Sequence, residues 1–296
     1  MDKTTSAHSN LPDVRVVLAP NPSAMTQDGT NTYILGHGRV AIIDPGPAIA
    51  GHMAAILATL LPGEQISHIF VTHAHRDHSG LAPPLAQATG AQVYAFGPAD
   101  AGRSLVMQRL AKLLPIGGGE GVDETFRPDI TLADGDRIFG DTWALEAIHT
   151  PGHMGNHLCF AAGTTLFAGD HVMGWSTSLV SPPDGDMTDY MTSLQRLAAR
   201  HWELILPGHG AALHKPAIRL AELLAHRHAR EAALLAALGA SATNIATLTS
   251  LVYRDLDADL IPAARRNVLA HLIDLERRKL VRAMPFSNPD ALFART

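Results

Sequence analysis

The sequence contains little thiol chemistry and no long apolar run. Its single cysteine, Cys159, excludes an internal disulfide, and its apolar neighbours favour a buried core thiol. No stretch approaches the roughly 20 apolar residues that a transmembrane helix needs. Residues 1–13 are polar and lack the apolar centre of a secretory signal. These absences predict a cytoplasmic protein that does not enter a membrane.

A strong positive charge is also missing. Residues 1–209 carry 11 basic and 20 acidic side chains, a net charge of −9, whereas residues 210–296 carry 12 and 8, a net charge of +4. The overall charge of −5 is not that of a general nucleic-acid binder. Bound divalent cations would offset part of the acidic excess, and the basic C-terminal part keeps nucleic-acid binding open.

Metal-binding side chains, by contrast, are concentrated at one point. Directly after the apolar residues 69–71, which predict a buried strand, four of them fall within six positions: His73, His75, Asp77 and His78. Imidazole and carboxylate are ligands of zinc and neighbouring divalent metals. Alternate residues of an extended chain point the same way, so His73 and His75 can hold one metal while Asp77 and His78 hold a second. A histidine-rich surface loop is the alternative, but the tight spacing at a strand end favours a metal site.

This cluster resembles the HxHxDH signature of the metallo-β-lactamase superfamily. Four further motifs occur in the order of that superfamily: Asp44 in IIDPG before the cluster, and His153 in TPGHM, Asp170 in FAGDH and His209 in LPGHG after it. The resemblance implies an α/β fold, an αββα sandwich with two metal ions. It implies that the first metal is bound by His73, His75 and His153, the second by Asp77, His78 and His209, and both by Asp170.

The same resemblance implies the chemistry of the site. A hydroxide bridging two divalent metals would attack the substrate, and Asp77 could orient it as a catalytic residue. Zinc is the expected metal, with manganese and iron as alternatives. Four neighbours could support the ligands or contact the substrate: Asp44, His157, His171 and Tyr190. For His157 and Tyr190, a supporting or packing role is the commoner interpretation.

The order of predicted elements divides the chain into three parts. Residues 1–213 form the catalytic domain, with strands over 14–18, 32–35, 40–43, 91–96, 130–132, 137–139, 143–148, 158–162, 165–168 and 204–206, and helices over 49–60 and 186–201. Residues 101–128 are predicted to be less regular, with a flexible glycine-rich loop at 117–121. A connecting helix over 214–239 is expected to be closed by Gly239.

Residues 240–296 are predicted to contain helices over 244–252 and 262–279, followed by a small β-wing over 280–286. This order resembles the small winged-helix domain that follows the catalytic domain in the β-lactamase-like endoribonucleases. The segments NPS (21–23), GTNTY (29–33) and HRHARE (226–231) are also similar to that branch. His226 and Arg230 lie four residues apart and could meet a phosphate, although a solvated helix face is the commoner interpretation.

Three functions are compatible with these patterns. The first is a binuclear metal-dependent hydrolase that cleaves single-stranded RNA. The acidic catalytic half argues against that substrate, and the short stretch between Asp170 and His209 has no room for the large insertion domain typical of many RNA-processing relatives. The second is a hydrolase of a small ester, thioester, lactone or lactam. The third is a non-catalytic nucleic-acid-binding protein, against which an open metal site argues. The expected partner is therefore a small molecule or single-stranded RNA, and a homo-oligomer remains open.

Overall fold

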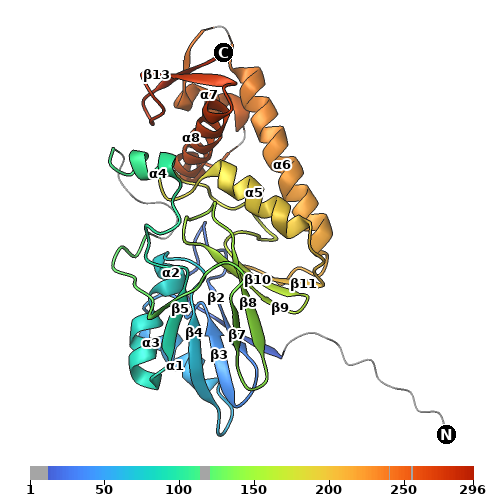
Figure 1. Cartoon of the computed structure of the whole chain (residues 1–296). Helices are drawn as coiled ribbons and strands as arrows, with labels where there is room; N and C mark the ends of the chain where they lie inside the picture. The colour runs from blue at the N-terminus through green and yellow to red at the C-terminus, as the bar shows by residue number, and fades with distance from the viewer. Residues whose placement is uncertain (1–12, 114–120, 240, 255) are drawn as a thin grey trace, which may run out of the picture.

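Two β-sheets packed face to face form the body of the molecule (Figure 1). The computed structural model describes residues 13–113, 121–239, 241–254 and 256–296. The strands of the first sheet lie in the order β1 (Val14–Leu18), β2 (Asn31–Leu35), β3 (Arg39–Ile43), β4 (Gln65–Phe70), β5 (Gln92–Ala95) and β6 (Ile130–Thr131). Strands β1 to β3 are antiparallel, and β3 to β6 are parallel.

The second sheet has the strand order β11 (Leu204–Pro207), β10 (Thr165–Gly169), β9 (Leu158–Ala162), β8 (Ala144–His149) and β7 (Arg137–Phe139). Only β10 and β11 are parallel. Their alignment matters because parallel neighbours end at the same edge of a sheet. The loops after β10 and β11 therefore lie side by side, as do those after the parallel strands of the first sheet.

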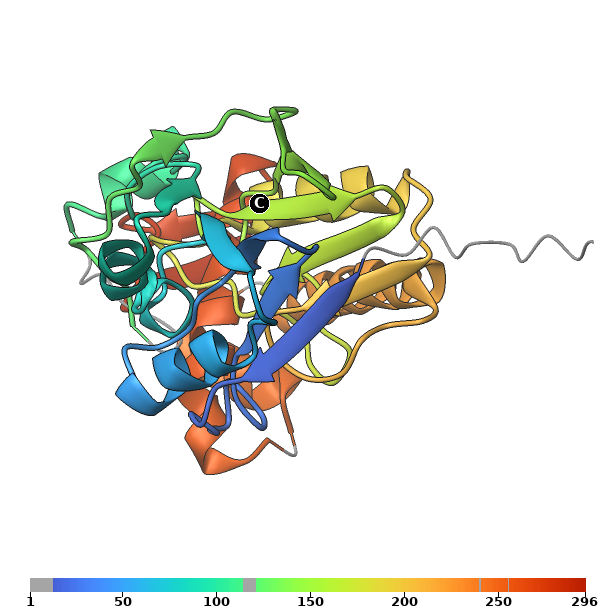
Figure 2. The same ribbon diagram turned by 90° about the horizontal axis from the view of Figure 1, so that it is seen from below.

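Helices cover both outer faces and complete four layers. On the first sheet lie α1 (Ala50–Ala58) and α3 (Ala82–Thr89), which Figure 2 shows on the side away from the second sheet. On the second sheet lie α5 (Met187–Ala198) and the start of α6 (Pro216–Ala237). The alternation in β3 explains the layering: Val40 and Ile42 pack under the helices, whereas Ala41 and Ile43 pack between the sheets.

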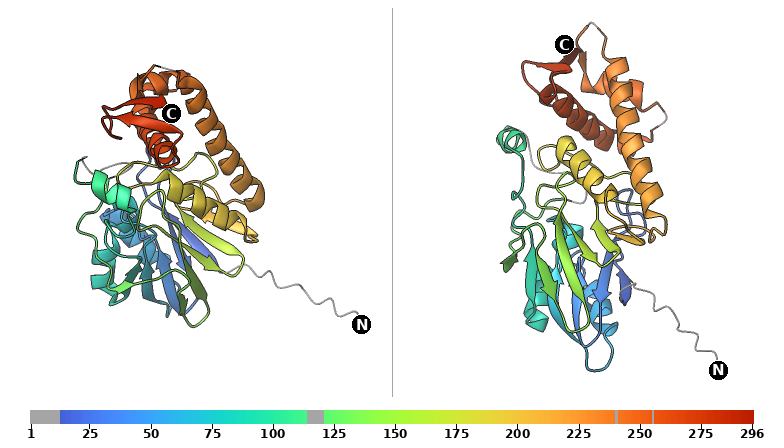
Figure 3. Two further views of the ribbon diagram at one scale, coloured as in Figure 1. Left: turned by 45° about the horizontal axis from the view of Figure 1, so that its top comes forward. Right: turned by 45° about the vertical axis from the view of Figure 1, so that its right-hand side comes forward.

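The C-terminal part is a winged helix placed over one end of the sandwich (Figures 1 and 3). It contains α7 (Ile245–Val252), the 3₁₀ turn η1 (Ala258–Leu260), α8 (Ile261–Arg277) and a sheet of β12 (Thr243–Asn244), β14 (Leu292–Arg295) and β13 (Val281–Met284). Helix α6 runs from the sandwich to this domain. The predicted αββα sandwich with a C-terminal winged helix is confirmed, and the domain boundaries at 213 and 239 remain predictions.

Two local predictions differ from the structure. Gly239 was expected to close α6 in a left-handed conformation, but its φ is not positive, and the chain leaves the helix at Leu238 in an extended conformation. Leu238 is buried in the core of the winged helix, so side-chain packing ends α6. The region expected to be less regular contains α4 (Leu105–Leu110), whose Met107 and Leu110 pack into that same core.

Two further points concern coverage of the chain. The glycine-rich loop predicted at 117–121 lies outside the described residues except for Gly121, as does the polar segment 1–13 except for Asp13. Among the described residues, no helix combines the length and the apolar character that crossing a bilayer would require.

Candidate metal centre

Seven buried histidine and aspartate side chains meet at the end of the sandwich that faces the winged helix. Each comes from a loop that follows a strand: β4 leads to the cluster at 73–78, β8 to His153, β10 to Asp170 and β11 to His209. Helix α2 (Arg76–Ser79) begins within the cluster and carries Asp77 and His78. The structure thus brings together all seven residues that the sequence proposes as metal ligands.

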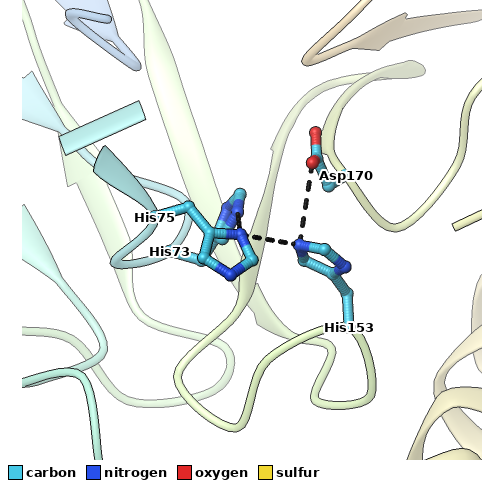
Figure 4. A group of neighbouring side chains, drawn as sticks. All are labelled: His73, His75, His153 and Asp170. Atoms are coloured by element: carbon cyan, nitrogen blue, oxygen red, sulfur yellow. Dashed lines mark hydrogen bonds and ion pairs between the residues drawn. The ribbon is translucent and has the colours of Figure 1, made fainter. Parts of the chain in front are cut away.

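The first group consists of His73, His75, His153 and Asp170 (Figure 4). Nδ1 of His75 lies 2.9 Å from Nε2 of His73 and 3.0 Å from Nε2 of His153. Nε2 of His153 lies 3.6 Å from Oδ2 of Asp170. Three ring nitrogens and one carboxylate oxygen therefore converge on one point, as the ligands of a tetrahedral or five-coordinate metal do.

The second group consists of Asp77, His78 and His209. Oδ2 of Asp77 lies 3.4 Å from Nε2 of His78 and 3.3 Å from Nε2 of His209. Asp170 reaches this group too, because its Oδ1 lies 3.3 Å from both imidazole nitrogens. The two oxygens of Asp170 therefore face different groups, as a carboxylate that bridges two metals would.

Hydrogen bonds on the outer side of three imidazole rings determine which ring nitrogen is available to a metal. Nδ1 of His153 donates to the carbonyl of Leu179 at 2.7 Å, and Nδ1 of His209 donates to the carbonyl of Gly29 at 3.1 Å. Nδ1 of His78 donates to Asp44 at 2.8 Å. Because a carbonyl or a carboxylate can only accept, Nδ1 of each ring keeps its hydrogen, and Nε2 is the nitrogen left to bind a metal.

Asp44 organises this outer layer as the sequence suggests. Its two oxygens also accept from the backbone N–H of Thr72 at 2.7 Å and from the hydroxyl of Thr72 at 2.8 Å. Since that hydroxyl gives its only hydrogen to Asp44, it accepts from Nδ1 of His73 at 3.0 Å. Asp44 therefore sets the tautomers of both His73 and His78.

The protonation of the first group agrees with metal binding. Burial, together with the neighbouring imidazoles, lowers the pKa of His73 well below its usual value and that of His75 to about 3. Burial likewise lowers the pKa of His153. Burial alone would raise the pKa of Asp170, but His209 and His78 hold it well below the usual range. Neutral imidazoles and an ionised carboxylate are the forms that ligate metals. In the second group burial lowers the pKa of both imidazoles, but Asp77 and Asp170 raise that of His78 well above its usual value, and Asp170 raises that of His209 to about 10. A metal that binds there would therefore displace protons from these two rings.

Unpartnered atoms provide a separate test of fit. Nε2 of His78 and Oδ1 of Asp170 are buried and have no hydrogen-bond partner within the described part of the chain. Buried polar atoms of folded proteins are almost always paired, and these two atoms, 3.3 Å apart, are placed to share a bound cation. The residues therefore fit a pair of divalent metal ions.

The loop between β1 and β2 holds the second group from the N-terminal side. Thr30 donates from its hydroxyl to Asp77 at 3.3 Å, and Asn21 donates to that hydroxyl at 3.0 Å. Gly29 has a φ of +138°, and a Cβ there would lie 2.0 Å from the carbonyl oxygen of Ala19. The outer segments 21–23 and 29–33 thus support metal ligands. The sequence offered no physical signal for this role beyond their resemblance to a family branch.

Three further candidates lie behind the ligands. His157 and His171 are fully buried, belong to neither group, and have neutral imidazoles because burial lowers their pKa, that of His171 to about 3. His157 contacts Thr150 at 2.9 Å, and Tyr190 donates from its hydroxyl to the carbonyl of His171 at 3.2 Å. Neither His157 nor Tyr190 lines the cavity at the metal centre, and Tyr190 packs in the core beside the second sheet.

The winged helix reaches the metal centre through the segment 178–180. The carbonyl of Ser178 accepts from Arg227 of α6, and the backbone N–H of Val180 donates to Asn267 of α8 at 3.0 Å. These two contacts flank Leu179, whose carbonyl orients His153. No local pattern predicts this contact because the three segments are far apart in the chain.

A cavity of about 290 Å³ opens onto the two groups. The sandwich contributes His75, Asp77, His153, Asp170 and His209, together with Met173, Trp175 and Leu179. The other wall comes from α6 and the winged helix, and its members are His226, Arg230, Tyr253, Leu256, Leu260, Ala263, Ala264 and Asn267. The open side of the metal centre thus faces a wall that combines apolar and polar residues.

Comparisons with known proteins agree with this description. Residues 25–209 match the metallo-β-lactamase superfamily, and residues 245–285 match the β-lactamase-associated winged helix domain. The chain is 31% identical over 277 residues to beta-lactamase-like protein 2 homolog of Drosophila melanogaster, covering 90% of this chain and 88% of that protein. It is 30% identical over 281 residues to atrochrysone carboxyl ACP thioesterase of Passalora fulva, covering 91% and 75%.

Among solved structures, a metallo-β-lactamase family protein from Thermus thermophilus has a TM-score of 0.76 at 24% identity, covering 96% of this chain and 98% of that one. That likeness shows the shared fold. The chain also spans 62% of the length of two fungal lactamase-like proteins. With its ordered ligand groups, its fold and these relatives, the chain is a metal-dependent hydrolase that belongs to the metallo-β-lactamase superfamily and carries a C-terminal β-lactamase-associated winged helix domain.

Proposed function

We propose that this hydrolase cleaves acyl thioesters of small acids, using two divalent metal ions, zinc being the first choice. His73, His75 and His153 would hold one ion, Asp77, His78 and His209 the other, and Asp170 both. When bound, such a pair supplies a hydroxide near neutral pH and stabilises negative charge on the attacked oxygen. Asp77, kept in place by Thr30, would orient the nucleophile.

The observation that carries this proposal is the cavity beside the ligands. Its volume of about 290 Å³ holds a small acyl group, since a cavity of about 150 Å³ binds benzene. Leu256, Leu260 and Ala263 give part of it an apolar surface, which is favourable for an acyl chain. The relative from Passalora fulva is named as a thioesterase, which supports the same substrate class.

The leaving group supplies a second argument. A thiol has a pKa near 8.5, so it can leave as a thiolate without a proton donor, whereas an alkoxide needs one. Among the described residues that line the cavity, His226 is the only imidazole outside the ligand groups. Burial and Arg227 lower its pKa, so it is neutral at pH 7 and a poor acid. The site is therefore better equipped for a thioester than for an alkyl ester or an RNA strand.

The experiment is a substrate panel tested on one metal-loaded preparation. We expect release of thiol from N-acetylcysteamine thioesters, measured with a thiol-reactive dye, to exceed turnover of the matching oxygen esters, a lactam and a labelled single-stranded RNA. Asp170→Ala should abolish this release and lower the bound metal, measured by elemental analysis. Cleavage of the RNA with no release of thiol would refute the proposal and leave the predicted RNA substrate in its place.

A further inference from the structure

One cationic side chain of the cavity has no acidic partner. Arg230, on the last third of α6, lines the cavity that also contains His75 and Asp170. Across the residues that the structure describes, no carboxylate forms an ion pair with its guanidinium, whereas the exposed Arg278 pairs with both Glu231 and Asp274. A half-buried positive charge without a counter-charge is unusual, because burial weakens its hydration.

The guanidinium of Arg230 is nevertheless held in one orientation. Nη1 donates to the carbonyl of Val252 at 2.7 Å, and Cζ lies 4.1 Å from the centre of the Tyr253 ring. Nε is buried without a hydrogen-bond partner, and Nη2 has none among the described residues. Nη2 is therefore the guanidinium nitrogen that can donate a charge-assisted hydrogen bond to a carboxylate or phosphate in the cavity.

The neighbouring basic groups do not provide this charge. Arg227 is buried, and it gives its hydrogen bonds to Ser178 and Asn267. Arg219 gives its own to the carbonyls of Met173 and Ser176. His226 is neutral at pH 7, since burial and the adjacent arginines lower its pKa. Arg230 is therefore the fixed positive charge that this part of the cavity wall presents.

We propose that Arg230 binds an anionic group of the substrate, so that the preferred substrates are thioesters carrying a carboxylate or a phosphate. This inference rests on the proposed thioesterase function. The anion has two possible sources, a carboxylate on the acyl group or a phosphate on the thiol carrier. In either case, Tyr253 and Val252 position the guanidinium, and the apolar residues around it accommodate the uncharged part of the ligand.

Matched substrates test the proposal and distinguish the sources. The pentanoyl and glutaryl thioesters of N-acetylcysteamine differ by a terminal carboxylate, and the pentanoyl thioesters of pantetheine and phosphopantetheine differ by a phosphate. In Arg230→Met we expect the ratio of kcat/KM for the anionic to the neutral member of one pair to fall roughly tenfold or more. The substrate pair whose kcat/KM ratio falls shows whether Arg230 binds the acyl carboxylate or the carrier phosphate. Arg230→Lys should give a ratio between those of the wild type and Arg230→Met.

Arg254→Met serves as the matched control for these comparisons. Arg254→Met removes an exposed positive charge next to Tyr253, outside the cavity lining, and should leave both ratios unchanged. Equal losses for the neutral and anionic members in Arg230→Met would indicate a structural role and overturn the proposal. Should Arg230→Met fail to fold, Arg230→Gln takes its place in every comparison.

The binding measurement does not depend on turnover. Glutarate and inorganic phosphate are titrated into the metal-loaded wild-type protein and into Arg230→Met, and the melting temperature is followed. A larger stabilisation of the wild type by either anion supports the anion site even if no thioester is cleaved, in which case only the thioesterase proposal fails. Equal stabilisation of both proteins by both anions overturns the anion site.

Discussion

The side-chain oxygen of Asn267 connects the winged helix to a metal ligand, and its removal should weaken metal binding. This oxygen accepts from the backbone of Val180 at 3.0 Å and from Arg227 at 3.4 Å. Asn267→Leu keeps a similar volume but has no acceptor. The segment that presents the carbonyl of Leu179 to His153 then loses one of its two anchors.

The expected loss of stability follows from the burial of the two donors that Asn267→Leu leaves without this acceptor. Val180 is fully buried and Arg227 is 2% exposed, so each unpaired donor should cost about 1–3 kcal/mol. Because Arg227 keeps its bond to Ser178, we expect the free energy of unfolding to fall by about 2–4 kcal/mol in total. Loss of a group that directly orients a ligand lowers metal affinity about 10–100-fold, and one step further out we expect about tenfold.

Competition with a chromophoric chelator measures the zinc affinity, and thermal melting of the metal-free protein measures the stability. Asn267→Asp is the matched control, because it keeps the oxygen acceptor and no described residue uses the amide hydrogens of Asn267. It should retain near-normal affinity. If Asn267→Leu melts earlier but binds zinc as tightly as Asn267→Asp does, then the segment holds His153 without the winged helix and the reasoning is refuted.

Three further changes test other parts of the site and fold. Asp44→Asn keeps a residue that tolerates the φ of +52° but removes the charge facing His78, and zinc affinity should fall about 10–100-fold in the same competition. Gly29→Ala would clash with the carbonyl of Ala19 and displace the acceptor of His209, so elemental analysis should find the metal content falling from two ions towards one. Asp189→Asn should stabilise the protein at pH 7 but not below about pH 4, measured by urea titration. Burial and Asp186 raise the folded pKa of Asp189 to about 6, so the stability from its bound proton is lost as pH rises from about 4 through 6.

The ligand residues could be proposed from sequence because their chemistry and their position coincide. His73 and His75 follow an apolar strand, and His153, Asp170 and His209 each follow another, so local patterns place every one at a strand end. Their order along the chain then allowed a known family to be matched. The αββα sandwich followed from that match, since alternating apolar residues alone do not specify how sheets pair.

The contacts between distant segments could not be predicted in this way. His226 and Arg230 have the spacing of an ordinary solvated helix face, and only the placement of α7 against α6 turns them towards the cavity. The end of α6 illustrates the same limit on a smaller scale, because Gly239 suggested a local stop signal whereas burial of Leu238 ends the helix. Tertiary packing decides both outcomes, and the periodicity of apolar residues along the sequence contains no information about it.

The shared wall of the cavity has a consequence for how such proteins diversify. The sandwich carries the whole ligand set, whereas α6 and the winged helix supply about half of the other residues that line the cavity. Substitution in the C-terminal domain can therefore redirect an enzyme to new substrates without disturbing its reaction centre. Exchange of residues 241–285 between relatives should transfer substrate preference as a unit, provided that the recipient keeps the contacts of Arg227 and Asn267 with segment 178–180.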